Sequence, residues 1–284
     1  MNQPTLNSGG GFFRARIDLS YDGTNFSGWG KQRDQRTVQG EVESALFTLF
    51  QQNLETTVAG RTDAGVHATG QVFHVDLPGH DYGDLAYRLN RILTEEIRIK
   101  SIQKVSGDFH ARFGALRRHY IYKILDGNSL LEPLKRFDVA PWYRDLDVDL
   151  MNQAANCVIG ERDFFSFAKF RENSTTIRDL QRFEFERNSE GLIIAHITAD
   201  AFLYNMVRSL IGTMVYIGEG RFPVDWAREV LESRERPSDS LVFPARGLTF
   251  IGVDYPEDSQ LSARVEKTMA LRKSNNVADE QDEE

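Results

Sequence analysis

The stretch TTVAGRTDAGVHATGQVFHVDL, residues 56–77, guides the interpretation of the whole chain. Two strand-like runs, residues 56–59 and 71–77, flank a connection that contains Gly60, Gly65 and Gly70. This connection is longer than the roughly two to five residues of an ordinary hairpin turn. Because glycine lets the backbone turn sharply and lets another chain approach closely, the stretch predicts a loop that presents a functional group between two strands.

Asp63 is the candidate functional group of this loop. Arg61 stands two residues before it, and a fixed positive charge there can keep a carboxylate ionised or hold a phosphate. An ionised carboxylate without a second acid beside it indicates a nucleophile or a base rather than an acid/base pair. The alternative is a turn aspartate that bonds its own backbone.

The composition indicates a globular protein of one large or two modest domains. The chain has 284 residues, of which 40% are hydrophobic and 27% are charged. No apolar run approaches the roughly 18 residues that a membrane span needs, and residues 1–11 lack the features of a signal peptide. The single cysteine, Cys157, excludes an intrachain disulfide and a cysteine-built zinc site. We therefore expect a cytoplasmic protein without a membrane segment.

The net charge of −8 argues at first against a polyanionic partner. Five of the acidic residues, however, lie in the final ADEQDEE, which is typical of a disordered tail. Basic residues gather locally in residues 31–36, 117–123 and 169–182. Local patches govern binding to phosphates better than net charge does, so the composition permits a nucleic-acid partner without requiring one.

Helix and strand signals alternate along the chain and predict two α+β halves that meet near residue 113. Hydrophobic periodicity predicts helices over residues 37–52, 85–93, 149–160, 201–218 and 223–233. Residues 119–125 read as a strand, and residues 182–187 and 191–199 read as a hairpin. The two ends, residues 1–11 and 263–284, are predicted to be flexible.

Other chemistries fit the residues less well. His67, His74 and Asp76 suggest a metal site, but ordinary polar exposure on one strand face explains the last two. The chain lacks the lysine spacing of a phosphate-binding P-loop and the serine motif of a nucleophile elbow. Cys157 lies in an apolar helix and is predicted to belong to the core.

Six segments of the chain, taken together and in order, resemble the motifs of the TruA family of tRNA pseudouridine synthases. The loop segment GRTDAGVHATGQV resembles the catalytic motif of that family. The resemblance runs from about residue 14 to residue 256, and it departs from the usual pattern at Gly30 and Thr94. The other five segments are YDGTNFSGWGKQ (21–32), GDFHARFGALRRHYIYKI (107–124), GERDFFSFAK (160–169), NMVRSLIG (205–212) and ARGLTFIGVDYP (245–256).

The resemblance implies isomerisation of uridine to pseudouridine in tRNA, without cofactor or metal. It implies an α+β fold of two RRM-like halves, residues 12–112 and 113–262, whose antiparallel sheets join around a central cleft. It also implies a homodimer that acts on the anticodon stem-loop at tRNA positions 38 to 40.

The resemblance also assigns roles to individual residues. It implies that Asp63 is the catalytic aspartate, which either adds covalently to the nucleoside or removes a sugar proton. Tyr120 matches the active-site tyrosine, with Tyr122 as the fallback candidate, for which core packing is the alternative. Arg208 would pair with Asp63 and keep it ionised. Two further residues would contact the substrate: Arg61, near the flipped nucleotide or a phosphate, and Leu248, as an apolar wall.

Two other functions fit parts of the sequence. A non-catalytic RNA-binding module would stack bases on strand aromatics such as Tyr120 and Tyr122, and it would tolerate substitution of Asp63. A hydrolase with an aspartate nucleophile would need a second carboxylate as acid, and no partner acid stands out in the motif-bearing segments.

Overall fold

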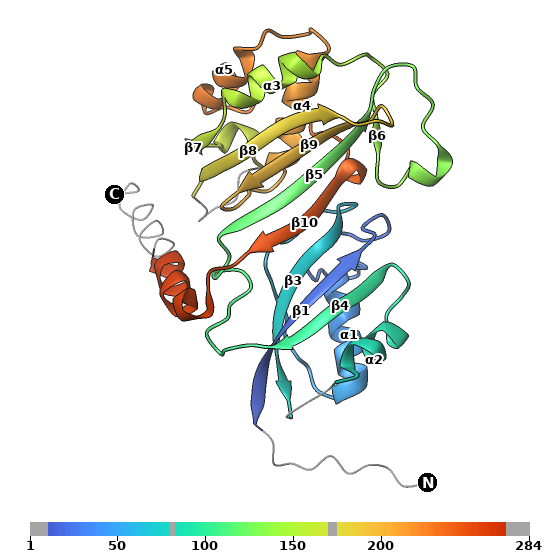
Figure 1. The fold of residues 1–284 in the computed structure, drawn as a ribbon, viewed down its shortest axis with the longest axis vertical. Helices are drawn as coiled ribbons and strands as arrows, with labels where there is room; N and C mark the ends of the chain where they lie inside the picture. Colours follow the sequence, from blue (N-terminus) through green and yellow to red (C-terminus); the bar gives the residue numbers. More distant parts are fainter. Residues whose placement is uncertain (1–10, 80–82, 170–174, 271–284) are drawn as a thin grey trace.

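The protein folds around one mixed β-sheet to which both halves of the chain contribute (Figure 1). The structure is a computed structural model that describes residues 11–79, 83–169 and 175–270. The strands follow the order β4-β1-β3-β10-β5-β9-β8-β7, with β2 beside β3 and β6 beside β5. The predicted α+β class is therefore confirmed.

The N-terminal half forms one end of the sheet. β1 pairs with β3 and β4 in antiparallel register, and apolar residues of β1 alternate with polar ones so that one face is buried. The helices α1 and α2 belong to this half (Figure 1). The elements are β1 (Phe12–Tyr21), α1 (Val38–Phe50), β2 (Thr57–Val58), β3 (His67–Pro78), α2 (Leu85–Ile92) and β4 (Ile97–Lys104).

The C-terminal half forms the other end and repeats the arrangement. β5, β9 and β8 pair in antiparallel register, and three helices accompany them. The predicted hairpin corresponds to β8 and β9. The elements are β5 (Arg117–Leu125), β6 (Ala140–Pro141), α3 (Val148–Asn156), β7 (Gly160–Asp163), β8 (Ile177–Arg187), β9 (Ile193–Ala199), α4 (Met206–Gly218) and α5 (Trp226–Ser233).

β10 (Leu248–Asp254) joins the two ends of the sheet. It pairs with β5 in antiparallel register and with β3 in parallel register, through Thr249 opposite His67 and Phe250 opposite Ala68. The joint between β10 and β3 is therefore parallel, whereas the strands on either side of it pair in antiparallel register, as expected for two joined antiparallel sheets. Because β3 begins where the Asp63 loop ends, this joint places the C-terminal half directly beside that loop.

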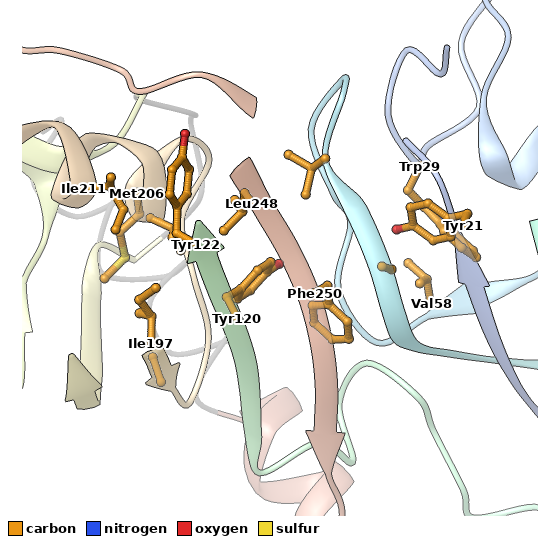
Figure 2. Close-up of a cluster of buried hydrophobic side chains, with 14 of the residues drawn as sticks. Tyr21, Trp29, Val58, Tyr120, Tyr122, Ile197, Met206, Ile211, Leu248 and Phe250 are labelled. Carbon is orange, nitrogen blue, oxygen red and sulfur yellow. The ribbon is translucent and has the colours of Figure 1, made fainter. Parts of the chain in front are cut away.

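Alternation along β5 separates the two faces of the sheet. Tyr120, Tyr122 and Ile124 point to the buried face, whereas His119 and Lys123 lie on the other, open face. In Figure 2 the rings of Tyr120 and Tyr122 extend from β5, and Leu248 and Phe250 extend from the neighbouring β10. Within the described residues, no helix combines the length and apolar character that crossing a bilayer requires.

Three boundaries differ from the sequence prediction. The helix predicted from residue 201 begins at Met206, because Asn205 adopts a left-handed conformation with φ of 66°. Gly160 starts β7 and does not end α3. A further helix covers residues 261–270, inside the tail predicted to be flexible; Leu261 is buried and Arg264 donates to the Ala115 carbonyl. Its polar sequence gave little periodic signal. Residues 1–10 and 271–284 of the predicted flexible ends lie outside the described residues.

Candidate active site

Residues 59–66, here called the Asp63 loop, connect β2 to β3 and are anchored by residues of the N-terminal half. The Trp29 amide donates to the Thr62 carbonyl over 3.0 Å. The buried Tyr21 hydroxyl lies 2.8 Å from Thr62 Oγ1, and Gln71 Nε2 donates to the Gly60 carbonyl over 2.9 Å. These bonds hold the loop backbone in one conformation, so that the direction of the Asp63 side chain is set.

Two glycines allow this close packing. Gly28 has φ of 89°, and a Cβ placed on it would lie 2.7 Å from the Thr62 carbonyl oxygen. Gly65 has φ of 77°, and its Cβ would lie 3.2 Å from the Cβ of Ala245 in the C-terminal half. Both positions favour glycine because a side chain would be strained there and crowded by its neighbour.

The structure brings Asp63 and Arg208 together from opposite halves. Arg208 Nη1 lies 3.7 Å from Asp63 Oδ2, and both side chains are largely buried, at 19% and 18% exposed. Arg208 Nε donates to the Phe243 carbonyl over 2.7 Å, which fixes the guanidinium. Arg208 lies in the first turn of α4, where the helix dipole also favours a negative group. The surroundings therefore stabilise an ionised carboxylate.

Tyr120 lies on β5 in the same cleft and is 7% exposed. Its ring makes edge contacts with Phe202 and Phe250, with centroids 5.2 and 5.0 Å away. Burial raises the pKa of the Tyr120 phenol well above its ordinary value, so the hydroxyl stays protonated at neutral pH. Leu248, the first residue of β10, lines the cleft as an apolar side chain.

Tyr122, the fallback candidate, has a different environment. It is fully buried, and its hydroxyl donates to the Pro244 carbonyl over 2.6 Å. A Cβ on Gly247 would lie 2.5 Å from the Tyr122 ring, so the backbone packs directly against it. The contacts are those of a core residue.

The cleft between the two halves has a volume of about 1050 Å³. Asp63, Tyr120, Arg208, Arg61 and Leu248 all line it, so the structure gathers these five predicted site residues, but not the fallback candidate Tyr122. Arg61 is exposed, and its side chain lies over Gly30: a Cβ there would be 3.7 Å from Arg61 Cδ. Within the described residues, no group of three or more His, Cys, Asp or Glu side chains is arranged to hold a metal ion.

Arg118 is a functional candidate that the sequence reasoning missed. It is 9% exposed, lines the cleft, and donates to the carbonyls of Ala59, Arg112 and Asp200. Burial lowers the pKa of its guanidinium, and its bonds go to carbonyl oxygens. Ala59 is the first residue of the Asp63 loop, so Arg118 ties that loop to the C-terminal half. The basic run at residues 117–123 was the available signal.

His67 holds the other end of the loop. Its Nε2 lies 2.7 Å from the Phe137 carbonyl and 3.2 Å from the Arg246 carbonyl, so this nitrogen carries a hydrogen. Nδ1 lies 3.0 Å from the Gly23 amide and 3.1 Å from Asp22 Oδ1. With the hydrogen on Nε2, Nδ1 accepts from the Gly23 amide. His67 bridges the halves.

The chain is similar in sequence to known tRNA-modifying enzymes. The profile of the tRNA pseudouridine synthase family matches residues 19–114 and 154–256. Two proteins called tRNA pseudouridine synthase A are close relatives. The one from Frankia casuarinae is 48% identical over 92% of this chain and 96% of its own length; the one from Cutibacterium acnes is 45% identical over 94% and 97%.

A third relative of the same name, from Mycobacterium leprae, is 45% identical over 92% of this chain and 96% of its own length. Among solved structures, the crystal structure of a Cbf5-Nop10-Gar1 complex is 10% identical and has a TM-score of 0.31, covering 71% of this chain and 54% of that one. That TM-score is too low to support an argument about fold or function.

Proposed function

The chain belongs to the tRNA pseudouridine synthase family, and we propose that it converts uridine to pseudouridine in the anticodon stem-loop of tRNA, at positions 38 to 40. The observation that supports this most directly is the meeting of Asp63 and Arg208, 3.7 Å apart, in a cleft large enough for a nucleotide. We take residues 12–112 and 113–262 as the two domains that form the walls of this cleft.

The reaction rearranges bonds without adding or removing an atom. The bond between N1 of uracil and C1′ of ribose breaks, the base turns, and C5 bonds to C1′ while the hydrogen of C5 leaves and N1 gains a proton. Asp63 serves this sequence either by adding to the nucleoside or by removing a sugar proton. Arg208 holds the carboxylate ionised and oriented for either role.

The other residues bind and orient the base. A uridine in a stem-loop must leave its stack before a side chain can reach it. Tyr120 offers an aromatic face and a protonated hydroxyl for proton transfer at C5, and Leu248 supplies an apolar wall. Arg61, exposed at the mouth of the cleft, contacts the flipped nucleotide or a phosphate.

The experiment that tests this function measures release of tritium from tRNA labelled at uridine C5. The Asp63→Asn variant keeps the side-chain shape but removes the charge, so release should fall by at least about 1,000-fold. Affinity for tRNA, measured by filter retention, should remain within about threefold, since a carboxylate adds nothing to phosphate binding. Asp138→Asn, an acid on the open face paired with Lys123, is the matched control and should release label normally.

Two outcomes would contradict the proposal. If neither the wild type nor Asp63→Asn released label while both bound tRNA, the chain would be a binding module. If label were released but positions 38 to 40 were unchanged in tRNA from cells lacking the protein, the assigned site would be wrong. We also propose a cytoplasmic homodimer, supported by the family resemblance; sedimentation as a monomer at micromolar concentration would exclude the dimer.

A further inference from the structure

The cleft is larger than one flipped nucleoside needs. Its volume of about 1050 Å³ lies at the upper end of the roughly 300 to 1,000 Å³ of sites that bury a drug-sized ligand. Asp63, Tyr120 and Leu248 surround only part of this space, and both walls extend beyond them. More of the RNA than the target base therefore fits inside.

The wall from the C-terminal half has a composition of its own, and we call it the aromatic–cationic wall. It begins at the active site, because the ring of Phe202 makes an edge contact with Tyr120 at 5.2 Å. It is built from the irregular segment before α4, the start of β8, and the short 3₁₀ helix Phe165–Phe167 with the residues just after it. Its five residues are Phe165, Lys169, Arg178, Phe202 and Tyr204.

Lys169 and Tyr204 are neighbours within this wall. The Lys169 amide donates to the Tyr204 carbonyl over 3.0 Å, which keeps the two residues side by side. Lys169 Nζ lies 5.9 Å from the centroid of the Tyr204 ring, and Tyr204 is 36% exposed. An exposed ring beside an ammonium group is the arrangement that stacks a base and holds its phosphate.

Arg178 adds a second cation to this wall. Its Nη1 donates to the Ile177 carbonyl, whereas its buried Nε has no hydrogen-bond partner among the described residues. The Asp200 carboxylate lies near enough to act on Arg178 through its charge, but its Oδ1 accepts from the amides of Asp179 and Ala201, and among the described residues it makes no hydrogen bond to Arg178. A buried donor left without a partner calls for an explanation, and an anionic ligand in the cleft supplies an acceptor for this guanidinium.

We propose that the aromatic–cationic wall is a subsite for an unpaired nucleotide adjacent to the flipped uridine. The base of that nucleotide stacks on Tyr204, and its phosphate bonds to Lys169 and Arg178. The identity of the RNA as tRNA rests on the proposed function; the ligand chemistry, an unstacked base with its phosphate, rests on the wall itself.

Stacking is tested with two substitutions of one residue. Tyr204→Leu removes the ring and should raise the dissociation constant and the KM for a tRNA transcript about tenfold, within the range for a lost base–aromatic stack. Tyr204→Phe keeps the ring and should stay within about twofold, and kcat should change little in either variant. Tyr143→Leu is the matched control, because Tyr143 is 82% exposed and does not line the cleft.

Phosphate contact is tested by the salt dependence of binding. Each lost contact to a single strand should reduce the slope of log affinity against log salt by about 0.7. Lys169→Gln and Arg178→Gln should each show that reduction, and Arg178→Lys should restore part of it. Arg182→Gln is the control, because Arg182 lies on the same strand but pairs with Glu184 on the open face.

The results separate this subsite from the proposed function. Equal binding by Tyr204→Leu and Tyr204→Phe would exclude stacking, and unchanged slopes in both cation variants would exclude the phosphate contact. If the wild type releases no tritium but the Tyr204, Lys169 and Arg178 variants show the expected changes in binding, the subsite stands and the proposed function is overturned. If the wild type releases tritium but the variants show no change in binding, the proposed function stands and the subsite is overturned.

Discussion

The open face of the sheet and the side that borders the cleft, here called the cleft face, differ in how their positive side chains are partnered. The cleft face is the part of the buried face that carries Tyr120 and Arg118. On the open face, four cations lie against a nearby carboxylate. Such exposed pairs add little stability, but they cancel the charge that this face presents. The pairs are Arg14–Asp76, Arg16–Asp18, Lys123–Asp138 and Arg182–Glu184.

On the cleft face, the cations bond mainly to neutral groups. Arg118 donates to backbone carbonyls, and Lys169 lies beside an aromatic ring. Two cations of the cleft do pair with a carboxylate. Arg208 shares its guanidinium between the Phe243 carbonyl and the Asp63 carboxylate, and Lys31 Nζ lies 3.6 Å from Glu43 Oε2. A chain of net charge −8 can therefore keep a cleft suited to phosphates, because its carboxylates lie mostly elsewhere.

The largest effect should follow from breaking the ion pair between Asp63 and Arg208. Arg208→Gln should lower kcat by about 100-fold or more, because Asp63 loses both its counter-charge and its orientation. Affinity for tRNA should change far less. Arg182→Gln, which breaks an open-face pair, should leave kcat unchanged. Steady-state kinetics of tritium release measure both, and equal losses in the two variants would remove the distinction between the faces.

The next comparison lies within the buried face, between Tyr120 and Tyr122. Tyr120→Phe should lower turnover by about 100-fold if its hydroxyl moves a proton. Tyr122→Phe should keep turnover and reduce the free energy of unfolding by about 1 kcal/mol, because it loses the bond to Pro244. Kinetics and urea denaturation distinguish the two. Full activity in Tyr120→Phe would reduce the role of that ring to stacking.

A smaller effect is expected where the two halves meet, at His67. In His67→Gln, the amide nitrogen can still donate to the Phe137 carbonyl, so turnover should fall only about twofold. In His67→Asn, the side chain is too short for that bond, and turnover should fall about tenfold with a lower Tm. If Gln and Asn were equally impaired, the bond across the joint would not be what positions the loop.

The smallest effect belongs to the open face. The bonds from Arg14 hold the pKa of Asp76 below its ordinary value. A lowered carboxyl pKa adds stability above the unfolded value near pH 4, and that contribution fades as pH falls through the folded value. Asp76→Asn should therefore lower stability by no more than about 1 kcal/mol at pH 7. Melting curves of both proteins should converge toward pH 3; a constant difference in Tm would refute this.

The local elements were largely predictable, and their joints were not. Hydrophobic periodicity located α1, α2 and the β8–β9 hairpin, because side-chain spacing repeats within a few residues. The segment that forms β10 carries a family motif, but its sequence did not predict the strand that joins the two halves. Its partner strands lie far away in the sequence, so no local pattern could reveal the parallel pairing of Thr249 with His67.

The sequence by itself determined the family, and it predicted the Asp63 loop, five site residues and the pairing of Arg208 with Asp63, because motif order and loop glycines are written in short stretches. The tertiary structure alone decided the remaining contacts. It placed Tyr122 in the core and Tyr120 in the cleft, and it gave Arg118 its three carbonyl partners. These contacts depend on the strand order of the sheet, which brings distant segments together only after the whole chain has folded.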